Sequence, residues 1–195
     1  MYIDAYQTPQ ENNTYIQQNL VSDAKQKKDT DNIDIFINQE VAIKKINNQF
    51  YFPINTEIGL DLNHSYQVAL SCNYGVQKFN LNNKDSSVSE ISNMWYCGNS
   101  FAFIPYASSI FHPKIKLFGG AGEAYGKQII TPSSKPMSLK FLTLKPSLDL
   151  EINVLQNLKF SLGTAYQFLF SNDSESLQNQ VSGAEGHISI SLNFK

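Results

Sequence analysis

Three polar residues near the C-terminus are of the types that serve in hydrolases. Glu185, His187 and Ser189 alternate along the chain and offer an acid, a base and a hydroxyl nucleophile. A hydrolase needs its base within hydrogen-bond reach of the nucleophile, and a third group to orient the base. In a strand, residues i and i+2 lie about 7 Å apart. These three residues therefore do not form a triad with one another, and we expect no enzyme.

A second set of charged residues could form ion pairs or a path for ions. Both signs occur in it, and its members share one face of their segments where polar and apolar residues alternate: Glu40, Lys44, Glu57, Asp61, Lys116, Lys145, Asp149, Glu151 and Lys159. Buried charges must be paired and hydrogen-bonded. A structural polar network is therefore our first interpretation, and a narrow ion path is the second. No spacing of His, Cys and Asp predicts a metal site, and no motif predicts a cofactor.

The two cysteines could form a disulfide or remain as thiols. If Phe79 faces Glu90 across an antiparallel pair, then Cys72 faces Cys97 on the apolar face. Directly opposed Cβ atoms lie about 4.5–5.5 Å apart, which is mostly wider than a disulfide requires. We therefore expect two free thiols, and a disulfide is the alternative if the protein is exported to an oxidising compartment.

The stretch 142–170 shows which elements must position these residues. Apolar residues occupy every second position from Leu144 to Val154, and the alternation restarts at Leu158 and runs to Phe170. A period of two is typical of a β-strand with one apolar and one polar face. The short turn at 155–157 makes the two strands a β-hairpin.

The same period predicts six further strands. They cover about 33–46, 50–62, 66–79, 90–106 and 114–127, and the last one ends at Phe194. Longer polar loops are expected at 80–89, 128–137 and 171–183, all on one rim. Eight strands in an up-and-down antiparallel order usually close into a barrel, because closure removes the edges. The barrel should span 32–195, after a polar N-terminal extension at 1–31.

Length and composition narrow the class of protein. A chain of 195 residues with a net charge of −2 is one domain, with or without a tail, and has no basic surface for nucleic acid. Apolar runs stay below the roughly 18 residues of a membrane helix, which excludes a helical membrane protein. Met1 is not followed by the basic start and apolar core of a signal peptide. The chain is therefore either cytosolic or trimmed.

The two faces of the strands indicate which side of the barrel meets water. The polar face is rich in Gly, Ala and Ser, which suit the crowded interior of eight strands. The apolar face has almost no charge at mid-strand, and aromatic residues gather near the strand ends, as they do in a membrane barrel. We therefore expect these residues to face lipid: Leu60, Leu70, Leu148, Leu150, Leu162 and Ile190. The rival is a soluble lipocalin-like calyx that carries a lipophilic ligand.

The pattern over 33–195 resembles the small outer-membrane β-barrels of Gram-negative bacteria, the OmpA-membrane-domain and OmpX-like class. Leu117–Gly126 is similar to the glycine-rich strand of that class, and Ile188–Phe194 is similar to the C-terminal signal that the barrel assembly machinery reads, although Lys195 follows the aromatic. The resemblance implies a transmembrane barrel in the outer membrane, with its signal peptide removed. Its partners would be outer-membrane lipid, the assembly machinery and other envelope proteins.

Three functions fit this resemblance. A structural or surface-interaction protein, or an accessory subunit of an envelope assembly, is our first interpretation, and a narrow channel for ions or small solutes is the second. The third is an outer-membrane lipid hydrolase of the lipid A deacylase kind. The Asn that follows the Ser in those enzymes is replaced here by Ile190, so this alternative is the weakest.

Overall fold

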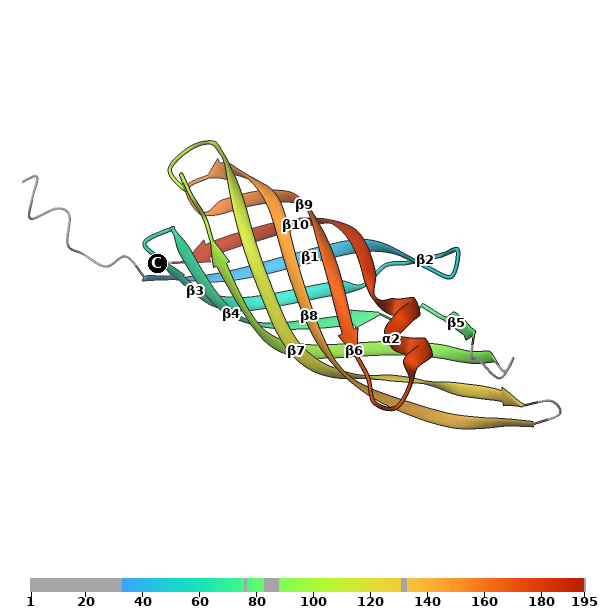
Figure 1. The fold of residues 1–195 in the computed structure, drawn as a ribbon. Coiled ribbons are helices and arrows are strands. Elements are labelled where there is room, and N and C mark those ends of the chain that lie inside the picture. Colours follow the sequence, from blue (N-terminus) through green and yellow to red (C-terminus); the bar gives the residue numbers. More distant parts are fainter. Residues whose placement is uncertain (1–32, 76, 83–87, 131–132, 195) are drawn as a thin grey trace, which may run out of the picture. The chain divides into compact units, whose positions relative to one another are not determined.

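The computed structural model describes residues 33–75, 77–82, 88–130 and 133–194. The barrel wall contains eight long strands (Figure 1). They are β1 (Ile33–Ile46), β3 (Ile54–Leu62), β4 (Tyr66–Gly75), β6 (Val88–Phe103), β7 (Phe111–Ile130), β8 (Ser133–Leu155), β9 (Leu158–Phe170) and β10 (Gly183–Phe194). Each pairs antiparallel with its neighbours, and β1 also pairs with β10, which closes the ring. The predicted eight-stranded up-and-down barrel is confirmed.

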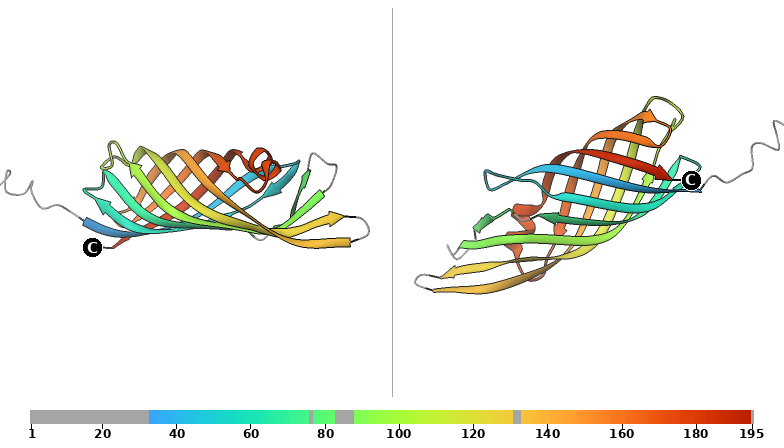
Figure 2. Two further views of the ribbon diagram at one scale, coloured as in Figure 1. Left: turned by 60° about the horizontal axis from the view of Figure 1, so that its bottom comes forward. Right: turned by 180° about the vertical axis from the view of Figure 1, so that it is seen from behind.

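The two ends of the barrel differ. One end carries the tight turns at 63–65 and 156–157, the link at 104–110, the start of β1 and the end of β10; we call it the turn end. The opposite end carries the Asn47–Asn48 turn, two short strands, β2 (Gln49–Tyr51) and β5 (Phe79–Asn82), and the helix α2 (Glu175–Val181); we call it the loop end (Figures 1 and 2). Within the described residues, no helix is long and apolar enough to cross a membrane.

The three predicted loops contain more regular structure than expected. The segment 128–137 is mostly strand, because β7 runs to Ile130 and β8 begins at Ser133. The segment 80–89 includes most of β5, which pairs with β6, and 171–183 holds α2. For 80–89 and 128–137 the predictions were wrong because polar residues break the alternation of hydrophobicity without breaking the backbone ladder, and the ladder defines a strand. The segment 171–183 does connect two strands, but it contains a helix. Residues 83–87 and 131–132 of these loops, and the extension at 1–31, lie outside the described residues.

Helix α2 has a clear local cause. Ser174 caps its N-terminus, and its Oγ accepts a hydrogen bond of 3.1 Å from the backbone N–H of Leu177. Leu177 and Val181 lie four residues apart, so they share one face of the helix and are fully buried. The helix therefore lays an apolar face on the loop end of the barrel.

Candidate functional site

The alternation of the strands brings the charged residues together inside the barrel. In the sequence, these residues were recognised because they lie at alternate positions, on the polar face of their strands. All nine members of the predicted set are at most 5 % exposed: Glu40, Lys44, Glu57, Asp61, Lys116, Lys145, Asp149, Glu151 and Lys159. Asp34, His112, Lys114, Glu185 and His187 are buried beside them. His112 and Lys114 alternate with Lys116 along β7, so the signal that indicated Lys116 applies to them too, although the predicted set did not include them.

Glu151 is the centre of the network in the turn-end half. Its carboxylate contacts His112 Nε2 at 3.0 Å, Lys114 Nζ at 3.4 Å and Lys159 Nζ at 3.3 Å. Ser161 Oγ also donates to it, at 3.4 Å. A carboxylate with this many charged partners keeps its own charge compensated although the side chain is fully buried.

Asp61 joins this group to the turn-end mouth of the barrel. Its Oδ2 accepts hydrogen bonds from Gln67 Nε2 at 3.1 Å and Asn193 Nδ2 at 2.9 Å, and it lies 3.5 Å from Lys159 Nζ. These donors come from β4, β10 and β9, so one carboxylate on β3 ties together strands on opposite sides of the lumen. The side chains of the network therefore cross the interior rather than lining it.

Two lysines organise the charges at mid-height. Lys116 Nζ lies 2.9 Å from Glu40 and 3.3 Å from Glu57. Lys145 Nζ lies 3.4 Å from Glu40 and 2.9 Å from Glu185. Glu40 is thus shared between two ammonium groups, and among the described, buried residues seven carboxylates face five lysines and two histidines. Acidic and basic groups are thus intermixed, and their mutual contacts can hold a fixed structure.

His187 does not belong to a hydrolytic triad. Inside the barrel its Nε2 hydrogen-bonds Asp149 Oδ1 at 2.8 Å, over Gly163 of the intervening strand β9, rather than the neighbouring Glu185. In the described part of the chain, no hydrogen bond joins His187 to Ser189. The arrangement pairs the base His187 with the acid Asp149, but among the described residues it places no hydroxyl within hydrogen-bond reach of His187.

Glu40, Glu185 and His187 also bring three atoms that could bind a metal within 4.8 Å of one another. The ammonium of Lys145 contacts both of these carboxylates. A lysine therefore supplies the positive charge that a metal would bring, and we assign no metal to this cluster.

The loop-end half of the interior is apolar, which sequence reasoning missed. A packed cluster there combines residues of five wall strands with β2, β5 and α2. We call it the apolar plug, and it comprises Ile46, Tyr51, Phe79, Leu81, Ile91, Met94, Tyr96, Phe118, Ala124, Leu139, Phe141, Leu169, Leu177 and Val181. Tyr96 packs against Phe118 and Phe141, with ring centroids 5.7 and 6.0 Å apart. Among the described residues, the plug fills the interior at this end.

A readable signal for the plug was present in the sequence. Leu169 lies two residues after Gln167, on the same inward face of β9, and Phe141 lies two residues before Thr143, on the inward face of β8. The side chains at inward-facing positions thus change from polar to apolar where these strands approach the loop end.

The residues that were predicted to face lipid lie on the outer face of the strands. All six are 44–64 % exposed on the outer face: Leu60, Leu70, Leu148, Leu150, Leu162 and Ile190. The barrel thus has charges inside and apolar side chains outside. This is the reverse of the arrangement in a soluble calyx, which has its apolar residues inside, so the rival interpretation as a lipocalin-like carrier does not fit this fold.

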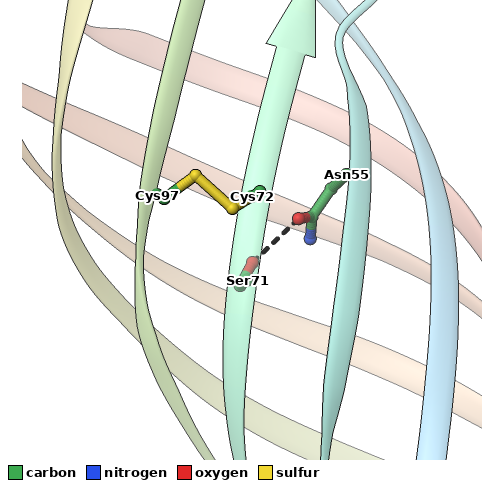
Figure 3. The surroundings of a disulfide bond; sticks show 4 residues. All are labelled: Asn55, Ser71, Cys72 and Cys97. Atoms are coloured by element: carbon green, nitrogen blue, oxygen red, sulfur yellow. Dashed lines mark hydrogen bonds between the residues drawn. A yellow bond between two sulfur atoms is a disulfide. The ribbon is translucent and has the colours of Figure 1, made fainter.

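Cys72 and Cys97 are joined by a disulfide on the outer face, whereas we expected free thiols (Figure 3). The two residues oppose each other as predicted, although Phe79 pairs with Ile91 rather than Glu90. Their Cα atoms are 4.1 Å apart, closer than the roughly 4.5 Å of an ordinary narrow pair. This approach brings the sulfurs within bonding reach. The neighbouring Ser71 points inward, where its hydroxyl donates to Asn55 Oδ1.

The fold and the filled interior define a closed eight-stranded barrel with an apolar outer face, and solved structures of this kind are similar to it. The attachment invasion locus protein Ail of Yersinia pestis matches with a TM-score of 0.49 and 14 % identity, over 83 % of this chain and 97 % of that one. The β-barrel domain of Pseudomonas aeruginosa OprF gives 0.45 and 12 %, over 83 % and 97 %.

Neisserial surface protein A is a third similar structure, with a TM-score of 0.45 and 12 % identity over 84 % of this chain and 96 % of that one. A scan of protein-family models and a search of curated proteins give no match.

Proposed function

We propose that this protein spans the outer membrane of a Gram-negative bacterium and serves as a structural or surface-interaction protein, or as an accessory subunit of an envelope assembly, rather than as a channel or an enzyme. One observation carries the proposal: a closed barrel buries its charges and exposes its large apolar residues. Leu70 and Leu162 are each 64 % exposed, whereas Asp61 and Glu151 are fully buried.

The physical argument for a membrane is the free-energy cost of exposing the apolar outer face to water. In water, the exposed leucines and isoleucines would form an apolar patch around the whole wall, far beyond what a soluble monomer exposes. In lipid, the same surface is favourable, and the closed ring leaves no strand edge unpaired along the wall. Aromatic residues near both ends of the outer face, such as Tyr66, Phe103 and Trp95, suit the two interfaces of a bilayer.

The direction of insertion follows from the two ends. Outer-membrane barrels have short periplasmic turns and longer extracellular connections. We therefore assign the turn end to the periplasm, together with the extension at 1–31, and the loop end with α2 to the cell surface. β10 would carry the signal that the barrel assembly machinery reads, and a signal peptide would have been removed.

The interior supports a structural role over conduction. A transmembrane path would have to pass the apolar plug, whose residues are at most 8 % exposed. It would also have to pass the ion pairs that Lys116 and Lys145 make at mid-height, which we call the ion-paired belt. Planar-bilayer recordings of the refolded protein should therefore show no discrete conductance. Stable unitary currents would favour the channel instead.

A depth-matched pair of substitutions tests the membrane placement. Leu150→Arg puts a charge on the outer face of β8, inside the turn-end limit of the strand at Leu155. We place this depth near the bilayer midplane, where a charge costs about 2–4 kcal/mol. Leu155→Arg puts the same charge at the turn end of the same strand, where the cost is about 0–1 kcal/mol. We expect the first variant to fail to assemble and the second to assemble normally, as read by the heat-dependent shift of folded barrels on electrophoresis. Equal assembly of both, or solubility without detergent, would contradict the proposal.

A further inference from the structure

A groove of about 590 Å³ lies on the outer face near the loop end. It is bordered by β6, β7, β8 and the segment that joins β9 to α2; we call it the interfacial groove. Both apolar and charged side chains line it, among them Ala121, Leu142, Phe170, Glu123, Lys140 and Asp173. A site of this mixed character suits a ligand that has an apolar part and a charged part.

The apolar and charged parts of the interfacial groove follow one another along the strands. One outward row crosses Trp95 of β6, Glu123 of β7 and Lys140 of β8. The next row towards the turn end crosses Ala121 and Leu142. Counted from the turn end, Glu123 and Lys140 are the first charged residues on the outer faces of β7 and β8. The groove therefore lies where the apolar band ends, at the loop-end interface between the proposed membrane and water.

The charged groups of the groove are held in place by the protein. The Tyr125 hydroxyl donates to Glu123 Oε2. Asp173 Oδ2 accepts a hydrogen bond of 3.0 Å from the backbone N–H of Lys140, and Ser171 Oγ donates to the backbone oxygen of Lys140 at 2.8 Å. Although Lys140 faces Glu123 in the strand register, its ammonium makes no ion pair with any described residue. The groove thus presents two positioned carboxylates and one ammonium that is available to a ligand.

We propose that the interfacial groove binds a phospholipid whose headgroup carries one phosphate and one amine, as in phosphatidylethanolamine. The Lys140 ammonium suits the phosphate, and the carboxylates of Glu123 and Asp173 suit the amine, because charge-assisted hydrogen bonds are the strong ones. The ring of Trp95 also lines the groove and attracts a cation held against its face. The acyl chains then lie over the apolar row.

Charge complementarity favours this headgroup over simpler ones. A headgroup that is only anionic meets two carboxylates for one ammonium, and like charges brought together disfavour binding. A headgroup without phosphate leaves Lys140 without a partner. The proposal rests on the membrane placement proposed above, since only that placement brings lipid to the groove.

Trp95, the single tryptophan of the chain, provides the measurement because it lines the groove. The full chain is refolded into vesicles of phosphatidylethanolamine mixed equally with phosphatidylglycerol, which lacks the amine, or with a glucosyl diacylglycerol, which lacks the phosphate. Bromine on the acyl chains of one lipid at a time quenches the tryptophan when that lipid is adjacent. Phosphatidylethanolamine should be preferred about threefold over each competitor, which is the size of effect expected for exposed ion pairs.

Two variants separate the two halves of the headgroup site. Glu123→Gln combined with Asp173→Asn should abolish the preference over phosphatidylglycerol, and Lys140→Gln should lower the preference over the glucosyl lipid. Glu175→Gln and Lys135→Gln are the matched controls, because they remove the same charges from exposed loop-end residues outside the groove. Both controls should keep the wild-type preferences. Electrophoretic heat-modifiability checks that each variant is folded.

The outcomes distinguish this proposal from the membrane placement. Equal quenching of the wild type by all brominated lipids would overturn the headgroup site and leave the membrane placement intact, whatever the variants do. Absence of quenching by every brominated lipid would overturn the membrane placement, and the lipid site with it. Free phosphorylethanolamine should leave the preferences unchanged because it has no acyl chain. If it abolished them, a soluble ligand would replace the lipid.

Discussion

The turn-end and loop-end halves of the barrel interior are filled by opposite chemistries. Around Glu151 and Asp61, carboxylates, lysines and amides cross the lumen and compensate one another. Around Tyr96 and Leu177, aromatic and aliphatic side chains pack under a helix and a short strand. One closed wall therefore encloses both a network that depends on complete pairing and a core that depends on close packing.

The difference shows what each half contributes. A buried ion pair recovers little net energy once the cost of removing both ions from water is counted, but losing one partner is very costly. An apolar core gains energy in proportion to the area it buries and tolerates substitutions of similar volume. We infer that the charged half holds the strands in one arrangement, while the plug seals the end that we assign to the cell surface.

The largest effect is expected from removing one charge at mid-height. Lys116→Met leaves Glu40 and Glu57 without a shared partner and should lower the free energy of unfolding by about 3–5 kcal/mol. Urea titration in lipid vesicles, read by the fluorescence of Trp95, the single tryptophan, measures this change. Lys116→Arg is the charge-preserving control, and Lys116→Met with Glu57→Gln should recover part of the loss. An unchanged urea midpoint in Lys116→Met would contradict the inference that the ion-paired belt needs every charge to be paired.

A cavity in the plug should cost less. Leu177→Ala empties part of the apolar face of α2 and should lower the free energy of unfolding by about 2–3 kcal/mol, at the lower end for a buried leucine because a helix at the rim can settle into the gap. Leu177→Met keeps the volume and serves as the control. A loss as large as that of Lys116→Met would erase the contrast between the two halves.

The attachment of α2 should give a smaller, local effect. Gln180 accepts a hydrogen bond from the backbone N–H of Asn82 at 3.0 Å and donates to its carbonyl at 2.6 Å. Gln180→Ala should destabilise the closed position of α2 by about 1 kcal/mol. Faster amide hydrogen exchange confined to α2 and β5 would report it, with Asn179→Ala as the control. Faster exchange throughout the barrel would instead mean that the plug and the wall unfold together.

The smallest effect is expected at the surface. Lys127 Nζ lies 3.6 Å from Glu90, and the lysine side chain is about half exposed. Lys127→Ala should change the free energy of unfolding by less than about 0.5 kcal/mol. The same urea titration checks it, and an effect near that of Lys116→Met would mean that burial does not separate the two kinds of ion pair.

Local alternation was sufficient to predict much of this architecture. The parity of Leu148, Leu150 and Leu162 against Asp149, Glu151 and Lys159 indicated strands with one polar and one apolar face, and it assigned each residue to a face. A strand has a period of two whatever its neighbours are. For this reason the barrel, its antiparallel order and the opposition of Cys72 to Cys97 were accessible before the structure.

Tertiary structure alone decided the features that depend on distance across the lumen or on the ladder. Residues far apart in the sequence meet inside the barrel, such as Lys116 with Glu40 and His187 with Asp149, and no local pattern specifies these pairs. The disulfide depended on a few tenths of an ångström between Cα atoms, and the extension of β7 and β8 into a predicted loop depended on backbone pairing. Sequence alternation thus determined which way each side chain points, and the closure of the ring decided what it meets there.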